Sequence, residues 1–327
     1  MGAEMNKPIT PTPILDPTAG AFVEGLAGGK PIQTLTPTEA RGVLTSVQKA
    51  ADVKLLDVQI KDVALPLGPT GSINIRVVRP AGATGVLPAI IYMHGGGWVL
   101  GDRETHDRLI RELATGANAA LVFVDYERSP EARYPVAIEQ GYAVANYVSN
   151  NADKLMIDGQ HIVIAGDSVG GNMAAAIALL AKERKGPNFR AQVLLYPVTD
   201  ASMSTRSYEQ FAAGPWLTRD AMAWYWEQYI PEAAQRSQTH ASPVNASKDE
   251  LSGLPQTLLM VDENDVLRDE GEAYGRKLAE AGVRVTSVRY NGTIHDFMML
   301  NALALTPAVR GAVGQATGYL RFVFSQP

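Results

Sequence analysis

The stretch that decides the fold is residues 162–170, Ile-Val-Ile-Ala-Gly-Asp-Ser-Val-Gly. Its first four residues form a continuously apolar run, which is typical of a strand buried on both faces of a sheet. A helical pattern begins near Gly170, so Ser168 lies on a tight turn from a strand into a helix. Such a turn strains the serine backbone and lifts its hydroxyl above the sheet, and it needs small residues two positions away on each side. Gly166 and Gly170 supply them.

The alternation of apolar and helical patterns around this turn predicts an α/β fold. Further apolar runs occupy residues 89–93, 119–124, 191–195, 257–261 and 283–288, and helical patterns occupy 105–117, 134–149, 169–184, 269–281 and 303–322. Because each apolar run is followed by a helical pattern, we expect a mostly parallel central sheet with helices on both faces. Earlier in the chain, residues 58–65 and 73–78 flank a Gly-Pro-Thr-Gly turn and predict an antiparallel hairpin.

Two segments fall outside this alternation. Residues 1–35 are rich in Pro, Thr and Gly, and Thr36-Pro37-Thr38-Glu39 then predicts the start of a helix that runs to about Ala51. Residues 218–229 form an aromatic helical pattern between two core strands, typical of a lid over a site, with a helix that covers the sheet edge as the alternative. We therefore expect an N-terminal arm and cap helix (1–52), a core (53–200 and 251–327) and a cap insertion (201–250).

Composition and charge exclude several classes of function. The chain has 327 residues, with 29 Lys and Arg against 34 Asp and Glu, a net charge of −5 and no cysteine. No basic stripe is present to bind a nucleic acid backbone, and disulfides, thiolate nucleophiles and cysteine-ligated metals are excluded. No secretory leader pattern or apolar run of about 18 residues occurs, so we expect a cytoplasmic protein without stable membrane insertion.

A glycine loop, His94-Gly95-Gly96-Gly97-Trp98, directly follows the predicted strand at 89–93. Consecutive glycines expose backbone N–H groups without a Cβ in the way, which suits a loop that approaches a reacting oxygen. A phosphate-binding loop is the alternative, but Asp102 stands where such a loop requires lysine, and the glycine spacing does not fit a dinucleotide fingerprint. The pattern therefore favours stabilisation of an oxyanion over phosphate binding.

A serine nucleophile needs a base and an acid that orients the base. Of the five histidines, His295 follows the last predicted strand, so we expect it at the same carboxyl edge of the sheet as Ser168. Asp262 and Asp265 both lie at the end of the preceding strand, and both compete for the role of the acid. The order serine, aspartate, histidine is the chain order of α/β-hydrolases.

These motifs together resemble the bacterial hormone-sensitive-lipase-like family of α/β-hydrolase esterases. The likeness runs from about Pro88 to Phe297, and it is carried by the stretches 94–98, 125–126, 129–131, 166–172, 196–197, 265–271 and 295–297. The resemblance implies a triad of Ser168, Asp265 and His295, and an oxyanion hole formed by the amides of Gly96, Gly97 and Val169. It also implies a helical cap, hydrolysis of short- to medium-chain acyl esters, and no metal or cofactor.

The resemblance leaves the substrate and the assembly open. Candidate pocket residues are Trp98, Asp167, Trp216 and Phe297, although the tryptophans also suit core or cap packing. Asp296 stands where glycine is usual in the family. We expect a small-molecule ester as the partner, with a homodimer through a sheet edge as a further expectation from the family. The alternative functions are an amidase or formamidase with the same triad, or a non-catalytic ligand-binding protein.

Overall fold

A computed structural model describes residues 12–327, in which eight strands form one sheet of order β1-β2-β4-β3-β5-β6-β7-β8. The strands are β1 (Val58–Leu65), β2 (Ile73–Pro80), β3 (Leu87–Met93), β4 (Ala120–Asp125), β5 (Ile157–Asp167), β6 (Ala191–Leu195), β7 (Gln256–Asn264) and β8 (Val285–Ile294). Only β2 runs antiparallel to its neighbours in this sheet, and the pairs from β4 to β8 are parallel. The predicted hairpin and the mostly parallel sheet are confirmed.

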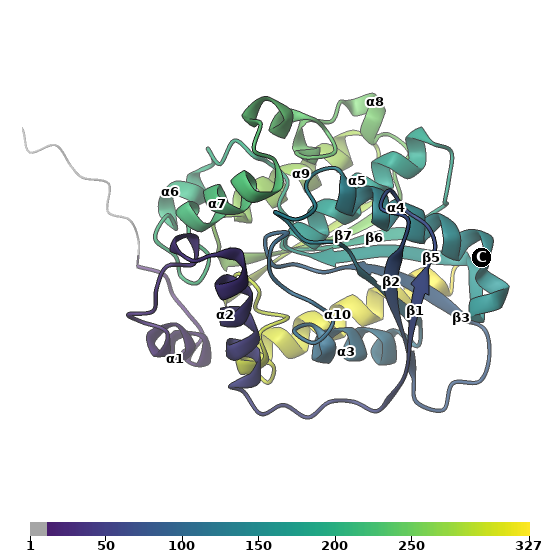
Figure 1. Cartoon of the computed structure of the whole chain (residues 1–327), viewed down its shortest axis with the longest axis horizontal. Coiled ribbons are helices and arrows are strands. Elements are labelled where there is room, and N and C mark those ends of the chain that lie inside the picture. The colour runs from purple at the N-terminus through teal and green to yellow at the C-terminus, as the bar shows by residue number, and fades with distance from the viewer. Residues whose placement is uncertain (1–11) are drawn as a thin grey trace, which may run out of the picture.

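Five helices cover the two faces of the sheet (Figure 1). On one face lie α3 (Asp107–Ala117) and α10 (Pro307–Phe324), and on the other lie α4 (Val136–Asn150), α5 (Val169–Glu183) and α9 (Arg268–Glu280). The central strands are apolar throughout because both of their faces are covered, and Ile162, Val163 and Ile164 of β5 are fully buried. The doubly covered sheet predicted from the alternation of patterns is therefore confirmed.

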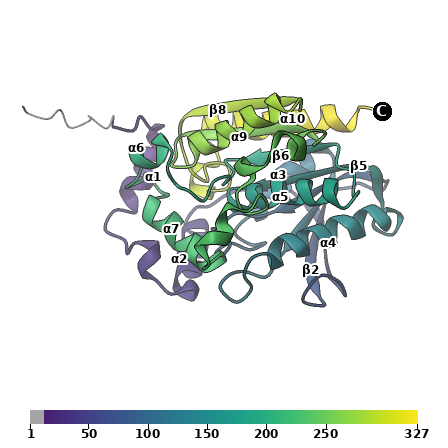
Figure 2. The ribbon, with the colours of Figure 1, turned by 90° about the horizontal axis from the view of Figure 1, so that it is seen from above.

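Most of the remaining helices lie at one end of the sheet. The remaining helices are α1 (Pro17–Gly25), α2 (Pro37–Lys49), α6 (Arg206–Gln210), α7 (Arg219–Tyr229) and α8 (Lys248–Leu251), with 3₁₀ turns at Ile32–Thr34, Ala152–Leu155, Ala233–Ser237, Pro243–Asn245 and Asn301–Leu303. Both views place α1, α2, α6 and α7 together at that end (Figures 1 and 2). Among residues 12–327, no helix has the length and apolarity to span a bilayer.

Two local expectations are wrong. The arm before residue 35 contains helix α1, which the glycine-rich composition concealed; Asp16 caps it by accepting from the amide of Thr18 at 2.8 Å, and Pro17 starts it. Strand β8 continues well beyond the apolar run at 283–288, as far as Ile294, which pairs with Asn264 of β7. As an edge strand β8 carries exposed polar residues, so an apolar run does not mark its full length.

Arg41, in helix α2, links the N-terminal segment to the core through side-chain hydrogen bonds and an ion pair. Its guanidinium donates to the carbonyl of Val99 at 2.8 Å and pairs with Glu131 at 2.7 Å. At the start of α2, Thr36 and Glu39 form a capping box. The helix thus begins at a defined residue and is held beside the loop that follows β3.

The turn between β5 and α5 is packed tightly against the end of β3. A Cβ atom added to Gly170 would lie 2.0 Å from the carbonyl oxygen of Met93, and one added to Gly166 would lie 2.3 Å from the backbone of Gly170. Real atoms do not approach so closely, so only glycine fits at these positions. This contact sets the distance between the turn and the glycine loop.

Replacing Gly170 with alanine should therefore destabilise the whole fold, by about 3 kcal/mol, because β3 and α5 must separate. Gly42 is the matched control, since it lies in the exposed interior of α2 with nothing within 4 Å of an added Cβ. Gly42→Ala should raise the free energy of unfolding by about 0.5–1 kcal/mol. Urea unfolding measures the free energy of unfolding of both variants. Equal values for Gly170→Ala and Gly42→Ala would contradict the packing argument.

Candidate active site

Three side chains from three strand ends meet at the carboxyl edge of the sheet. Ser168 follows β5, Asp265 follows β7 and His295 follows β8. The Nε2 atom of His295 lies 2.8 Å from Ser168 Oγ, and its Nδ1 atom lies 2.7 Å from Asp265 Oδ2. All three are buried, with exposed fractions of 4%, 1% and 2% for the serine, aspartate and histidine. They form one hydrogen-bonded row from hydroxyl to imidazole to carboxylate.

The backbone of Ser168 has the strained conformation expected of its turn. Its φ is 56° and its ψ is −120°, a region that residues with a Cβ seldom occupy. The amide of Ser168 donates to the carbonyl of Leu195 at 2.8 Å, and its carbonyl accepts from the amide of Val198 at 3.2 Å. These hydrogen bonds to Leu195, the last residue of β6, and to Val198 just after it hold the turn in this conformation. The hydroxyl of Ser168 is thereby directed toward His295.

The two competing aspartates have different surroundings. Asp265 bonds to the imidazole and also accepts from the amide of Leu267 at 3.0 Å, whereas Asp262 Oδ2 stays 3.9 Å from His295 Nδ1. No hydrogen-bond donor among residues 12–327 reaches the oxygens of Asp262. Burial and the nearby charges of Asp265 and Asp296 raise the pKa of Asp262 well above its usual range. Burial without a donor thus favours the neutral form of Asp262, and Asp265 is the carboxylate that is hydrogen-bonded to the imidazole.

His295 is held in its protonated form to an unusually high pH. Burial lowers the pKa of its imidazole, but the charges of Asp265 and Asp296 and the hydrogen bond with Asp265 outweigh burial and raise the pKa to about 9. Asp296 Oδ1 lies 3.4 Å from Nε2, the nitrogen that faces Ser168. The site thus stabilises an imidazolium ion strongly.

The glycine loop after β3 lies beside the serine and presents free amides. Gly96 and Gly97 have φ values of 111° and 62°, so both occupy the left-handed region that favours glycine. In the described chain neither amide has a hydrogen-bond acceptor, and the amide of Val169 begins α5. A Cβ on Gly97 would lie 2.2 Å from the ring of Tyr225 in α7, so the cap packs directly on the loop. These amides are free to bind an anionic oxygen.

Asp167 holds the glycine loop in place and does not line the cavity described below, contrary to the expectation of a pocket residue. It accepts from Tyr92 Oη at 2.7 Å and from the amide of Gly95 at 3.1 Å, and it pairs with His106 at 3.2 Å. Burial lowers the pKa of His106, but the charge of Asp167 more than offsets burial and leaves that pKa raised. Tyr92 and His106 had no distinguishing motif in the sequence, so sequence reasoning missed their role.

His94, at the start of the loop, is neutral. Burial and the charge of His106 lower the pKa of His94 to about 3. Its Nδ1 atom lies 2.7 Å from the carbonyl oxygen of Gly95 and its ring stacks on Tyr126, with centroids 4.2 Å apart. His94 therefore supports the backbone of the loop.

A cavity of about 650 Å³ opens above the row and the loop. It is lined mainly by apolar side chains from two segments far apart in the sequence. Residues 23–47 contribute Val23, Leu26, Ile32, Val43, Leu44 and Val47, and residues 212–225 contribute Trp216, Leu217, Met222 and Tyr225. Ser168, His295 and Asp296 lie at its polar end. The expectation for Trp216 as a lining residue agrees with this arrangement.

Two other expected pocket residues do not line the cavity. Trp98 stacks on Tyr229 with ring centroids 4.1 Å apart and is 1% exposed, because its position beneath α7 turns the ring into the core. Phe297 packs between Tyr196 and Tyr290 and is also 1% exposed. Both aromatic rings therefore pack in the core and do not face the cavity.

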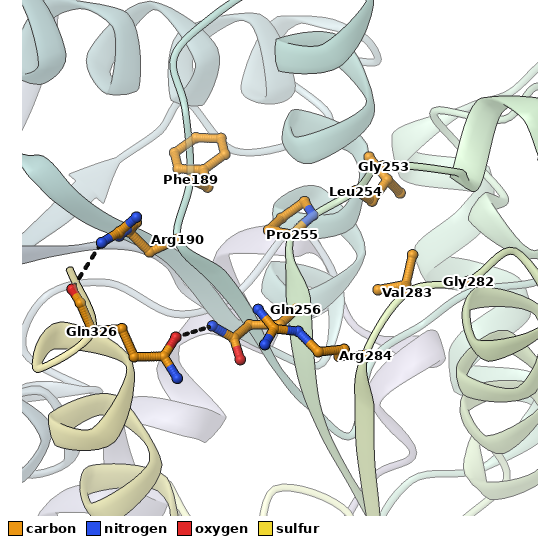
Figure 3. A pocket seen from close by; sticks show the side chains of 10 residues that line it. All are labelled: Phe189, Arg190, Gly253, Leu254, Pro255, Gln256, Gly282, Val283, Arg284 and Gln326. Carbon is orange, nitrogen blue, oxygen red and sulfur yellow. Dashed lines mark hydrogen bonds between the residues drawn. The ribbon is translucent and has the colours of Figure 1, made fainter.

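A second cavity, of about 300 Å³, lies at the opposite edge of the sheet (Figure 3). It is bordered by residues at or just before the starts of β6, β7 and β8, including Arg190, Gln256 and Arg284. The hydrogen bonds drawn there run from Arg190 to the carbonyl of Gln326 and between the side chains of Gln256 and Gln326. None of the three residues in the hydrogen-bonded row borders this cavity.

One cluster in the described chain has the spacing of a metal site, but its members are already engaged. Candidate ligand atoms of Asp262, Asp265 and His295 lie within 4.8 Å of one another. Both ring nitrogens of His295 are used, one by Asp265 and one by Ser168. A metal ion would have to displace one of these bonds, so the donor set does not fit a resident metal.

Comparisons with known proteins agree with this geometry. Residues 90–299 match the model of a family described by the alpha/beta hydrolase fold. A putative alpha/beta hydrolase of Acanthamoeba polyphaga mimivirus is 43% identical over 296 residues, 90% of this chain and 84% of that protein. Carboxylesterase NlhH of Mycobacterium tuberculosis is 33% identical over 326 residues, 97% of this chain and 98% of that protein. The crystal structure of a thermostable esterase from Pseudomonas putida has a TM-score of 0.95 and 48% identity, covering 97% of this chain and 100% of that one.

The raised pKa of His295 can be tested directly. We expect an NMR titration of the imidazole to give a pKa of about 9, because two carboxylates face the ring. In Asp265→Asn the nearer charge is lost, so the pKa should fall by at least about one unit. Titration of His295 below pH 6.5 in the unaltered protein would contradict the electrostatic account.

Proposed function

This chain belongs to the family of alpha/beta hydrolases, and we propose that it is a serine carboxylesterase in which Ser168 is the nucleophile. Two of the relatives reported above are named esterases, which confirms the resemblance to the hormone-sensitive-lipase-like family and identifies the reaction as hydrolysis of carboxylic esters. The observation that carries the assignment of residues is the hydrogen-bonded row of Ser168, His295 and Asp265.

The row supports a two-step reaction through an acyl-enzyme. Ser168 Oγ attacks the ester carbonyl while His295 Nε2 accepts its proton. His295 then donates this proton to the leaving alcohol, and Asp265 orients the ring and stabilises the imidazolium. In the second step His295 removes a proton from water, which attacks the acyl carbon. His295 then returns this proton to Ser168 Oγ as the bond between the acyl carbon and Oγ breaks and the acid is released.

The free amides beside the serine would stabilise the charge that develops on the carbonyl oxygen. We assign this role to the amides of Gly96, Gly97 and Val169. They are fixed before the substrate arrives, because Asp167 holds the loop and α5 holds Val169. Preorganised donors of this kind do not need to reorient as the charge forms, and removing one such donor typically lowers the rate by about 100- to 1,000-fold.

The electrostatics of His295 set the pH range of the reaction. A general base must be neutral, and the pKa of His295 is raised to about 9. Activity at subsaturating ester should therefore increase from pH 6.5 to about 9, as the fraction of neutral imidazole rises.

The apolar cavity supports short- to medium-chain acyl esters as substrates. Its volume of about 650 Å³ is within the usual range for small-molecule sites. We assign residues 1–52 and 201–250 to a cap, supported by the described parts of both segments that line this cavity. A homodimer and a cytoplasmic location remain predictions from the sequence.

Neither alternative function is favoured. A non-catalytic binding protein would not need the hydrogen-bonded row, which is intact here. An amidase or formamidase could use the same row, but the named activities of the relatives reported above are those of esterases.

Replacing Ser168 with alanine should reduce hydrolysis of 4-nitrophenyl butyrate by at least about 10⁴-fold, because no nucleophile remains. Circular dichroism and the unfolding midpoint should stay close to those of the unaltered protein. Incubation with EDTA should leave the unaltered enzyme fully active. Substantial turnover by Ser168→Ala would overturn the proposed function.

The two aspartates can be separated by paired substitutions. Asp265→Asn should lower kcat by about 10³- to 10⁴-fold, because the amide cannot stabilise the imidazolium. Asp262→Asn should lower kcat by less than about 10-fold, because Asp262 does not bond to the imidazole and its burial favours the neutral form of the carboxyl. Stopped-flow or steady-state kinetics on one ester would compare them, and the reverse order of effects would assign the acid to Asp262.

A further inference from the structure

Asp296 joins the catalytic row to the wall of the cavity. Its Oδ2 atom accepts a hydrogen bond from Trp216 Nε1 at 2.9 Å, and its Oδ1 atom lies 3.4 Å from His295 Nε2. Both Asp296 and Trp216 line the cavity. The reaction derived above assigns no role to this carboxylate, although it lies beside the nitrogen that transfers the proton.

The backbone at this contact is in a conformation that few side chains adopt. Asp296 has a φ of 66° and Trp216 has a φ of 64°. Glycine would adopt both conformations without a steric cost, although aspartate tolerates this region better than most residues. Strain that persists at two hydrogen-bonded positions beside a reacting group points to a functional role.

Burial raises the pKa of Asp296, and the charge of His295 and the hydrogen bond from Trp216 offset this only in part, so the negative charge of Asp296 is poorly compensated. Its side chain is 15% exposed, and its one ion-pair partner among residues 12–327 is His295. That imidazolium already pairs with Asp265 at 2.7 Å. Within the described lining of the cavity, the other charged side chains outside the row are Lys30 and Asp220, and both are exposed.

A carboxylate in such a place affects which ligands can enter. An anionic substrate would meet a like charge in a region where water screens little, and the oxyanion of the reaction would add a further negative charge. A neutral ester meets no such repulsion, and a cationic ester is attracted. The apolar walls alone would not distinguish ligands by the sign of their charge.

We propose that Asp296 determines specificity by making the cavity accept uncharged and cationic esters and exclude esters that carry a carboxylate. This inference rests on the esterase function proposed above. The recognised class is defined by the sign of the charge that the ester carries into the cavity, with the acyl chain held by the apolar walls.

Three esters with one acyl skeleton test the proposal. They are the methyl 4-nitrophenyl diester of adipic acid, 4-nitrophenyl hydrogen adipate, and 4-nitrophenyl 6-(trimethylammonio)hexanoate, which are neutral, anionic and cationic at pH 8. Release of nitrophenolate gives kcat/KM for each. We expect the unaltered enzyme to prefer the neutral ester to the anionic one by at least about 10-fold.

Asp296→Asn removes the charge and keeps an oxygen that can accept from Trp216. It should reduce the preference for the neutral over the anionic ester by about 10-fold or more, and it should lower the relative rate of the cationic ester. The ratio of two esters cancels any change in the basicity of His295, because both esters use the same base. Turnover of the neutral ester reports that the variant is folded.

Asp220→Asn is the matched control. It removes the same charge from the same cavity, but at an exposed position where solvent screens it. In Asp220→Asn, the ratio of kcat/KM for the neutral ester to kcat/KM for the anionic ester should change by less than about 3-fold.

Two results would overturn the proposal while leaving the esterase function intact. One is equal hydrolysis of the neutral and anionic esters by the unaltered enzyme, which needs no variant. The other is an unchanged ratio in an Asp296→Asn protein that still hydrolyses the neutral ester. Failure of the esterase function itself would appear separately, as turnover that persists in Ser168→Ala.

Discussion

The close contact between the end of β3 and the turn at Ser168 is the constraint on which the site depends. Gly170 leaves no room for a side chain against Met93, so β3, β5 and α5 can approach only in one arrangement. The glycine loop that continues from β3 is thereby placed beside the serine, with its amides unoccupied. Nucleophile and anion-binding amides are thus positioned by the same backbone contact, before any substrate is present.

Four aspartates near this contact show how local surroundings give one residue type different tasks. Asp265 is hydrogen-bonded to the imidazole, and Asp167 pairs with His106 and holds the loop. Asp262 is buried without a donor among residues 12–327, which favours its neutral form. Asp296 faces the cavity and has only a shared counterion. Burial is common to most of them, so the donors and cations within reach decide the role of each.

The cap connects distant parts of the chain to the reacting groups. Tyr225 of α7 packs on Gly97, and Trp216, which precedes α7, bonds to Asp296 next to the catalytic histidine. From the other side, Arg41 of α2 bonds to the loop that follows β3. Substrate selection and catalysis therefore share residues, and changes in the cap can alter the electrostatics of the row.

Local patterns in the sequence predicted the order of strands and helices, the serine turn, the glycine loop and His295, because strand periodicity and the steric needs of a turn are short-range properties. They left Asp262 and Asp265 equivalent, concealed α1 and the end of β8, and suggested Trp98, Asp167 and Phe297 as pocket residues. Choosing between two carboxylates three residues apart depends on which one reaches a histidine thirty residues later, and whether a tryptophan faces core or cavity depends on the helix above it. Those distances and burials exist only once the sheet has closed and the cap has packed, so the tertiary structure alone decided them.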